Sequence, residues 1–168
     1  MKRILSKVIF WLFGWKATGS FDFPKKCLII AAPHTSNWDF VIGRLYGYIS
    51  GISPKYLAKS ELFLPILGTF FRWNGAIPVD RYSKNNLVDQ IAERFNISNS
   101  FMLGIAPEGT RSRVEKWKTG FYHIALKANV PVLLLALDFK NKEIGIINTL
   151  IPTGDINKDM IFIQNQFK

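Results

Sequence analysis

Short apolar runs alternate with amphipathic segments along this chain of 168 residues, and that alternation limits the folds open to it. Residues 27–32 and 130–139 are the strongest apolar runs, and each has the length of a buried strand. Shorter strands are predicted at 56–58, 75–79, 101–106 and 143–148, and helices at 37–49, 85–96 and 118–129. Alternating strands and helices favour a single α/β layered domain over residues 1–168, with a mixed, mostly parallel sheet flanked by helices.

One residue of this pattern places a strand within the sheet, and two segments have no single predicted structure. Pro78 predicts that the 75–79 strand lies at an edge or an end of the sheet, because proline cannot donate to a strand ladder. Residues 61–71 are rich in Phe and Leu but are interrupted by Pro65 and Gly68, so they fit either a core helix or a surface that meets lipid. The segment from residue 151 onward has no assigned structure.

Composition narrows the function classes. The chain is 48% apolar and 20% charged, which excludes disorder as its main state. Its net charge of +10 favours anionic partners, such as nucleic acid, an acidic membrane surface or phosphorylated small molecules. The 14% aromatic content suits contact with lipid better than contact with nucleic acid. Cys27 is the only cysteine, so an intrachain disulfide and a thiol-rich zinc site are both excluded, and a reducing cytosol fits.

Residues 1–20 are basic and amphipathic. At helical spacing Ile4, Val8, Trp11, Leu12 and Trp15 share one side, with lysines and an arginine flanking them. This pattern is typical of a helix that lies in a membrane interface, which would place the protein peripherally on the cytoplasmic face of a membrane. Two alternatives are a helix that packs this stripe on the domain and a cleaved secretory signal. The apolar run is too short to span a bilayer.

Polar residues follow several predicted strands, where α/β sheets bind their ligands. His34 comes directly after the 27–32 strand, and Asp39 lies in the first turn of the next helix. Thr35 or Ser36 is a natural N-cap for that helix. If His34 lies on the turn and Asp39 reaches back, the carboxylate can accept from one ring nitrogen and leave the other as a base. The alternative is a structural histidine held by a helix aspartate. The second histidine, His123, is interpreted as structural.

Cations follow the other strands. Lys59, Arg81, Arg111 and Arg113 would form an anion pocket if they converge, and the alternative is four solvated surface cations. Gly109 permits a tight turn in the segment 107–113. Glu108 can pair with Arg111 and hold the arginine side chain in position. No nucleophile accompanies His34, because Cys27 lies inside an apolar strand and no serine stands in a nucleophile elbow.

Four segments together resemble the glycerolipid acyltransferase family, which includes the bacterial 1-acylglycerol-3-phosphate acyltransferases. They are the His-x-x-x-x-Asp block at 34–39, Gly-Ala-Ile-Pro-Val-Asp-Arg at 75–81, Pro-Glu-Gly-Thr-Arg-Ser at 107–112 and Val-Pro-Val at 130–132. Residues 59–62 and 118–120 also stand in family order. The resemblance covers roughly residues 26–137 and is specific because the blocks keep their order and spacing. Ala106 departs from it, since many members carry an aromatic residue there.

The resemblance implies transfer of a fatty acyl group from an acyl thioester, on CoA or acyl carrier protein, to the hydroxyl of a lysophospholipid such as 1-acylglycerol 3-phosphate. Another lysophospholipid or a lyso-aminolipid stays open as the acceptor. His34 would act as general base with Asp39 orienting it, and a backbone N–H near Gly109 would serve the oxyanion. The implied substrate-binding residues are Arg81, Glu108, Gly109, Thr110 and Arg111, to which charge and position add Lys59 and Arg113. No metal and no redox cofactor is implied.

Two other functions remain as alternatives. A non-enzymatic nucleic-acid-binding or lipid-binding protein would explain the basic charge, although the aromatic residues lie in apolar runs rather than among cations. A thioesterase-like relative would hydrolyse the thioester without an acceptor.

Overall fold

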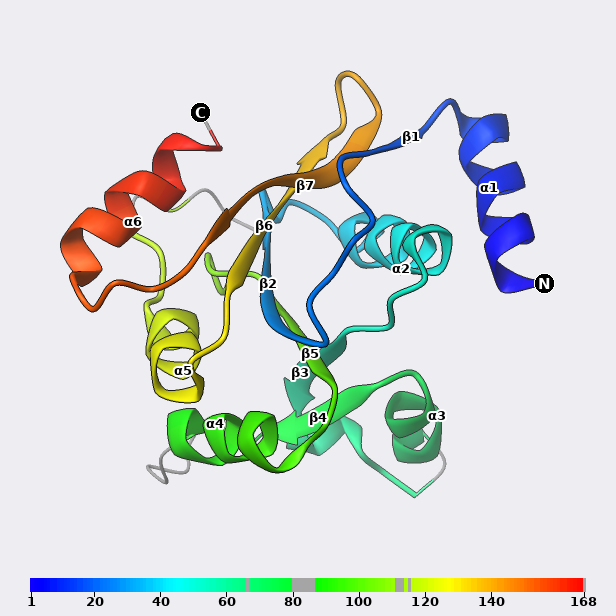
Figure 1. Cartoon of the computed structure of the whole chain (residues 1–168). Coiled ribbons are helices and arrows are strands. Elements are labelled where there is room, and N and C mark those ends of the chain that lie inside the picture. The colour runs from blue at the N-terminus through cyan, green and yellow to red at the C-terminus, as the bar shows by residue number, and fades with distance from the viewer. Residues whose placement is uncertain (66, 80–86, 111–113, 115, 168) are drawn as a thin grey trace.

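The described part of the chain forms one seven-stranded sheet with helices on both faces (Figure 1). In this computed structural model the described residues are 1–65, 67–79, 87–110, 114 and 116–167. The strand order is β1-β7-β6-β2-β5-β3-β4. The strands are β1 (Lys16–Thr18), β2 (Lys26–Ala32), β3 (Lys55–Lys59), β4 (Ala76–Val79), β5 (Phe101–Ile105), β6 (Val132–Asp138) and β7 (Glu143–Leu150). All neighbours run parallel except β6 and β7, which confirms the predicted fold class.

Helices cover both faces of this sheet. They are α1 (Lys2–Phe13), α2 (Trp38–Ser50), α3 (Leu67–Trp73), α4 (Leu87–Ile97), α5 (Gly120–Ala128) and α6 (Ile156–Asn165), with a 3₁₀ turn, η1, at Ser60–Leu62. Alternate residues of the central strands pack on opposite sides. Leu28 and Ile30 of β2 join a core with α4, α5 and α6, whereas Cys27 and Ile29 join a second core with α1 and α2. Burial on both faces explains why β2 is a continuous apolar run rather than an alternating one.

The predicted elements match the structure with three differences. The 61–71 segment divides at Pro65 into η1 and α3 instead of forming one helix, and its exposed side chains include Leu64, Leu67 and Phe70. The strand β1 has only three residues and was not predicted, since so short a run has no detectable periodicity. The unassigned C-terminal segment forms α6. Pro78 does lie in an outer strand, β4, as predicted.

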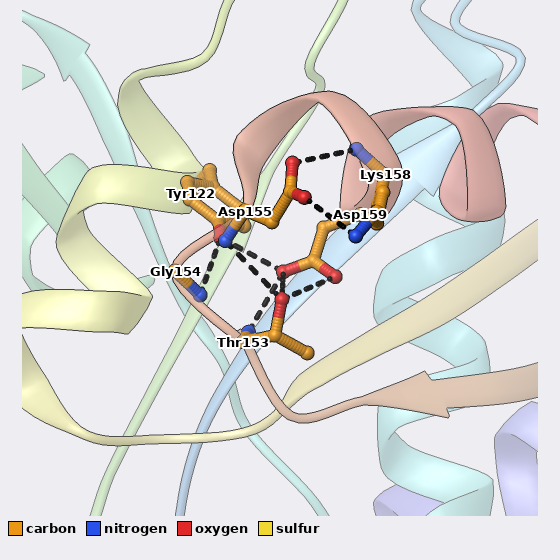
Figure 2. A network of polar contacts seen from close by, with 6 residues as sticks. All are labelled: Tyr122, Thr153, Gly154, Asp155, Lys158 and Asp159. Carbon is orange, nitrogen blue, oxygen red and sulfur yellow. Dashed lines mark hydrogen bonds and ion pairs between the residues drawn. The ribbon is translucent and has the colours of Figure 1, made fainter.

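A buried polar network holds α6 against the rest of the domain (Figure 2). The Tyr122 hydroxyl on α5 donates to Asp159 Oδ2 on α6 at 2.8 Å, and the Thr153 N–H before α6 donates to the same oxygen at 2.7 Å. The N–H of Gly154 in turn donates to the Tyr122 hydroxyl at 3.0 Å. Burial by itself raises the pKa of Asp159, but these hydrogen bonds outweigh it and lower the pKa below its usual 3.8. The network therefore stabilises an ionised carboxylate inside the fold.

Helix α1 packs on α2, but not through the stripe identified in the sequence. Its buried residues are Ser6 and Phe10, whereas Val8 and Trp11 of the stripe are 44% and 78% exposed. Trp15 alone turns inward and contacts Phe139 edge to face. The alternative in which the whole stripe packs on the domain is therefore wrong. None of the helices in the described residues is long and apolar enough to cross a bilayer.

Candidate active site

His34 and Asp39 meet at the carboxyl end of β2. His34 Nδ1 lies 3.0 Å from Asp39 Oδ2, and the side chains are 27% and 6% exposed, respectively. The ring stands on the turn and the carboxylate reaches back from the first turn of α2, which is the geometry required by their spacing. With Nδ1 turned to the carboxylate, Nε2 is the ring nitrogen left for a ligand. The pair can therefore act as an oriented base.

The loop between them is shaped around the carboxylate. Asp39 Oδ2 also accepts the backbone N–H groups of Thr35 at 2.6 Å and Ser36 at 2.9 Å, and the Ser36 hydroxyl donates to Oδ1 at 3.2 Å. The predicted cap differs from the observed one, because the N-cap residue of α2 is Asn37 and makes no side-chain cap bond. Ser36 Oγ instead accepts the Trp38 N–H at 3.1 Å. Asp39 thus organises the turn as well as orienting the imidazole.

Glu108 joins this turn to the loop after β5. Both carboxylate oxygens accept the backbone N–H of His34, at 3.1 and 3.3 Å. Strands β2 and β5 are adjacent and parallel, so their carboxyl ends bring the two loops together. The sequence suggested that Glu108 pairs with Arg111, which lies outside the described residues. The observed role of Glu108 is to hold the backbone beside His34.

Gly109 is in the left-handed region at φ 66°, and Lys118 lies across it. A methyl group added to Gly109 would lie 2.8 Å from Lys118 Cε and 2.9 Å from Nζ. The Lys118 N–H donates to the Pro107 carbonyl at 2.8 Å, which fixes the base of the lysine at the same turn. The N–H of Gly109 itself donates to the Ala106 carbonyl at 3.1 Å. That group is therefore already engaged and does not serve as an oxyanion donor in this conformation.

The other predicted binding residues are less closely tied to His34. Thr110 is exposed and follows Gly109 directly. Lys59 is exposed at the end of β3, which β5 separates from β2. Arg81, Arg111 and Arg113 lie outside the described residues, so the predicted convergence of four cations stays a prediction.

His123 and Cys27 stand apart from this site. His123 is exposed on α5, where its ring contacts Tyr122 edge to face. Cys27 is fully buried in β2, and burial raises the pKa of its thiol to about 12. A protonated, buried thiol is a poor nucleophile. Within the described ranges no three His, Cys, Asp or Glu side chains gather as a metal site would require.

A groove of about 490 Å³ lies beside the His34 turn. It is lined by Pro33 and Thr35, by the end of β6 at 136–139, and by Gln166 and Phe167 after α6. Asp138 is the ionisable residue of this lining, and bonds from the backbone and side chain of Asn141 lower the pKa of its carboxyl. The described lining of the groove contains no cationic side chain.

Two residues of this region were not among the predicted site residues. Ser36 bonds Asp39, and Lys118 covers Gly109. Ser36 lies inside the His-x-x-x-x-Asp block at 34–39, and this position could have identified it as a site residue from the sequence. Lys118 lies in the segment 118–120, which stands in family order but carried no role.

Comparisons with known proteins agree with one another. Residues 15–137 match the model of a protein family described as Acyltransferase. The chain is 28% identical over 147 residues to 1-acyl-sn-glycerol-3-phosphate acyltransferase from Haemophilus influenzae, covering 80% of this chain and 59% of that protein. It is also 28% identical to the enzymes of the same name from Escherichia coli over 143 residues, covering 77% and 58%, and from Limnanthes douglasii over 145 residues, covering 80% and 50%.

A solved structure has the same fold. The crystal structure of the 1-acyl-sn-glycerophosphate (LPA) acyltransferase PlsC from Thermotoga maritima superposes with a TM-score of 0.65 and 18% identity. The match covers 98% of this chain and 76% of that one. The chain spans between half and three fifths of the length of the curated relatives from Haemophilus influenzae, Escherichia coli and Limnanthes douglasii.

Proposed function

Since the chain belongs to the acyltransferase family, we propose that it transfers a fatty acyl group from an acyl thioester to the free hydroxyl of 1-acylglycerol 3-phosphate. The observation that carries this proposal is the His34–Asp39 contact, which leaves one imidazole nitrogen as a base at the carboxyl end of β2. The names of the similar proteins support the acceptor. The proposed acyl donor is a thioester of the fatty acid with CoA or with acyl carrier protein.

In the proposed mechanism His34 Nε2 takes the proton of the acceptor hydroxyl while Asp39 stabilises the imidazolium that forms. The oxygen then attacks the thioester carbonyl to give a tetrahedral intermediate. Collapse of that intermediate breaks the carbon–sulfur bond, and the imidazolium returns its proton to the departing thiolate. The products are a diacylglycerol phosphate and a free thiol, with no acyl-enzyme. Protonated, buried Cys27 supports a mechanism without a cysteine nucleophile.

The test is a panel of acceptors offered with one labelled long-chain acyl thioester, with products identified by mass. The panel contains 1-acylglycerol 3-phosphate, other lysophospholipids, a lyso-aminolipid and no acceptor, and it is run with both CoA and carrier-protein donors. We expect acyl transfer to be fastest to the lysophosphatidate. Thiol release that needs no acceptor would identify a thioesterase instead. Salt-dependent nucleic-acid binding without either reaction would reject the enzymatic assignment.

The protein is further proposed to work from the surface of an anionic membrane. Ile4, Val8, Trp11 and Leu12 of α1 leave an apolar stripe exposed to solvent. Lys7 lies on the same helix, and basic residues near an anionic surface contribute about 1 kcal/mol each. A lysophospholipid with a long acyl chain is held by bilayers, so a peripheral position brings the site to its substrate.

Replacing Trp11 and Leu12 together with alanine should weaken binding to anionic vesicles at least about tenfold, since each buried apolar side chain contributes roughly 1.5–3 kcal/mol. Vesicle sedimentation measures this. Both side chains are exposed, so the melting temperature should not change. The matched control is Ile161→Ala, which removes an exposed apolar side chain from α6. Equal losses from the control and the double variant would exclude a specific role for α1.

A further inference from the structure

Lys118 lies at the turn that Glu108 fastens to His34. Its aliphatic chain crosses Gly109, and its backbone N–H is bonded to the Pro107 carbonyl. Glu108, between those two residues, bonds the backbone of His34. Lys118 is therefore connected to the backbone of His34 through the 107–109 turn. The backbone bond to Pro107 and the contact with Gly109 hold the Lys118 side chain at this turn.

The ammonium of Lys118 has no acidic partner among the described residues. The ion pairs of those residues join Lys16 to Glu143, His34 to Asp39, Lys127 to Asp89 and Lys158 to Asp155. Among the described residues of the same turn, the carboxylate of Glu108 is engaged with the backbone of His34. Lys118 is exposed, so its charge is open to a ligand.

The chemistry of the acceptor restricts where its phosphate can lie. In 1-acylglycerol 3-phosphate the reacting hydroxyl and the phosphate are on neighbouring carbons, so a cation that holds the phosphate must stand close to His34. The groove on the Pro33 and Thr35 side contains the carboxylate of Asp138 and no cationic side chain in its described lining. The Gly109 turn contains Lys118 instead.

We propose that Lys118 binds the phosphate of the acceptor and thereby places the neighbouring hydroxyl at His34. This inference rests on the proposed acyl transfer to 1-acylglycerol 3-phosphate and adds a residue to which no role had been given. An ammonium on a flexible stem suits a phosphate as a point charge. The close packing of the stem on Gly109 restricts that flexibility.

The decisive variant is Lys118→Met, which keeps an unbranched stem over Gly109 and removes the charge. We expect the KM for 1-acylglycerol 3-phosphate to rise about 10- to 100-fold, the range for loss of one charge-assisted hydrogen bond. The KM for the thioester should stay unchanged, and so should the rate of transfer to monoacylglycerol, which has no phosphate. Lys116→Ala, which removes an exposed lysine from the same segment, is the control and should leave all three values unchanged.

Two outcomes would overturn the role of Lys118. If Lys118→Met equals the parent protein while Lys118→Ala is impaired, the stem matters only for packing. If Lys118→Met slows transfer to both acceptors equally, the lysine supports the turn without contacting phosphate. A binding test without turnover separates this inference from the proposed reaction. Titration with sn-glycerol 3-phosphate, followed by NMR shifts of the Thr110 and Lys118 amides, should saturate in the parent and weaken in Lys118→Met, and equal titrations would reject the assignment.

Discussion

Replacing His34 with alanine should lower the turnover number for acyl transfer by about 10²- to 10⁴-fold, the usual contribution of a positioned general base. The KM values should change little, because residue 34 keeps its backbone N–H and can still donate it to the Glu108 carboxylate in the variant. Steady-state kinetics with 1-acylglycerol 3-phosphate measures the loss. The melting temperature of the variant is the control for folding.

Asp39→Asn tests the second half of the pair. Asparagine is nearly the same size and can still accept the N–H groups of Thr35 and Ser36, but it lacks the charge that stabilises an imidazolium. The variant should therefore fold and be slower, since the imidazolium that forms during the reaction loses its carboxylate partner. A His34→Ala enzyme with near-parental turnover would remove the imidazole from the mechanism.

The largest effect on stability is expected from Asp159→Ala. The change leaves the buried Tyr122 hydroxyl and the Thr153 N–H without their acceptor, at a cost of about 3 kcal/mol. For a domain of this size that corresponds to roughly 6–12 °C in Tm. Calorimetry measures it. The matched control is Asp155→Ala, which removes the N-cap of the same helix and should cost only about 1 kcal/mol.

The same network predicts that the stability of the folded chain depends on pH in the acid range. The pKa of Asp159 is lower in the folded chain than its usual 3.8, so the unfolded chain binds the proton more tightly. The stabilisation is present at neutral pH and is lost as the pH falls through and below that value. Asp159→Asn should lose this part of the acid sensitivity. An unchanged slope of stability against pH below 4 would contradict the ionised state of the buried carboxylate.

Strands β2 to β7, helices α2, α4 and α5, and the His34–Asp39 pair could be predicted because each depends on residues close together in the chain. Proline breaks and strand-length apolar runs define β2 and β6, and a spacing of five residues limits how His34 can reach Asp39. The contacts that join distant segments could not be predicted in this way. Glu108 reaches His34 across 74 residues and Tyr122 reaches Asp159 across 37. Such pairs depend on which loops the sheet order brings together, and no local periodicity encodes that.

The two outer strands of the sheet have a consequence for the proposed position of the protein on a membrane surface. At one border β1 offers only three residues, and at the other Pro78 removes a donor from β4. Crowding on a plane aligns neighbouring molecules, and aligned sheet borders are templates for strand addition between copies. Borders that are this short or interrupted by proline make poor templates. We therefore expect the chain to tolerate high lateral density without polymerising.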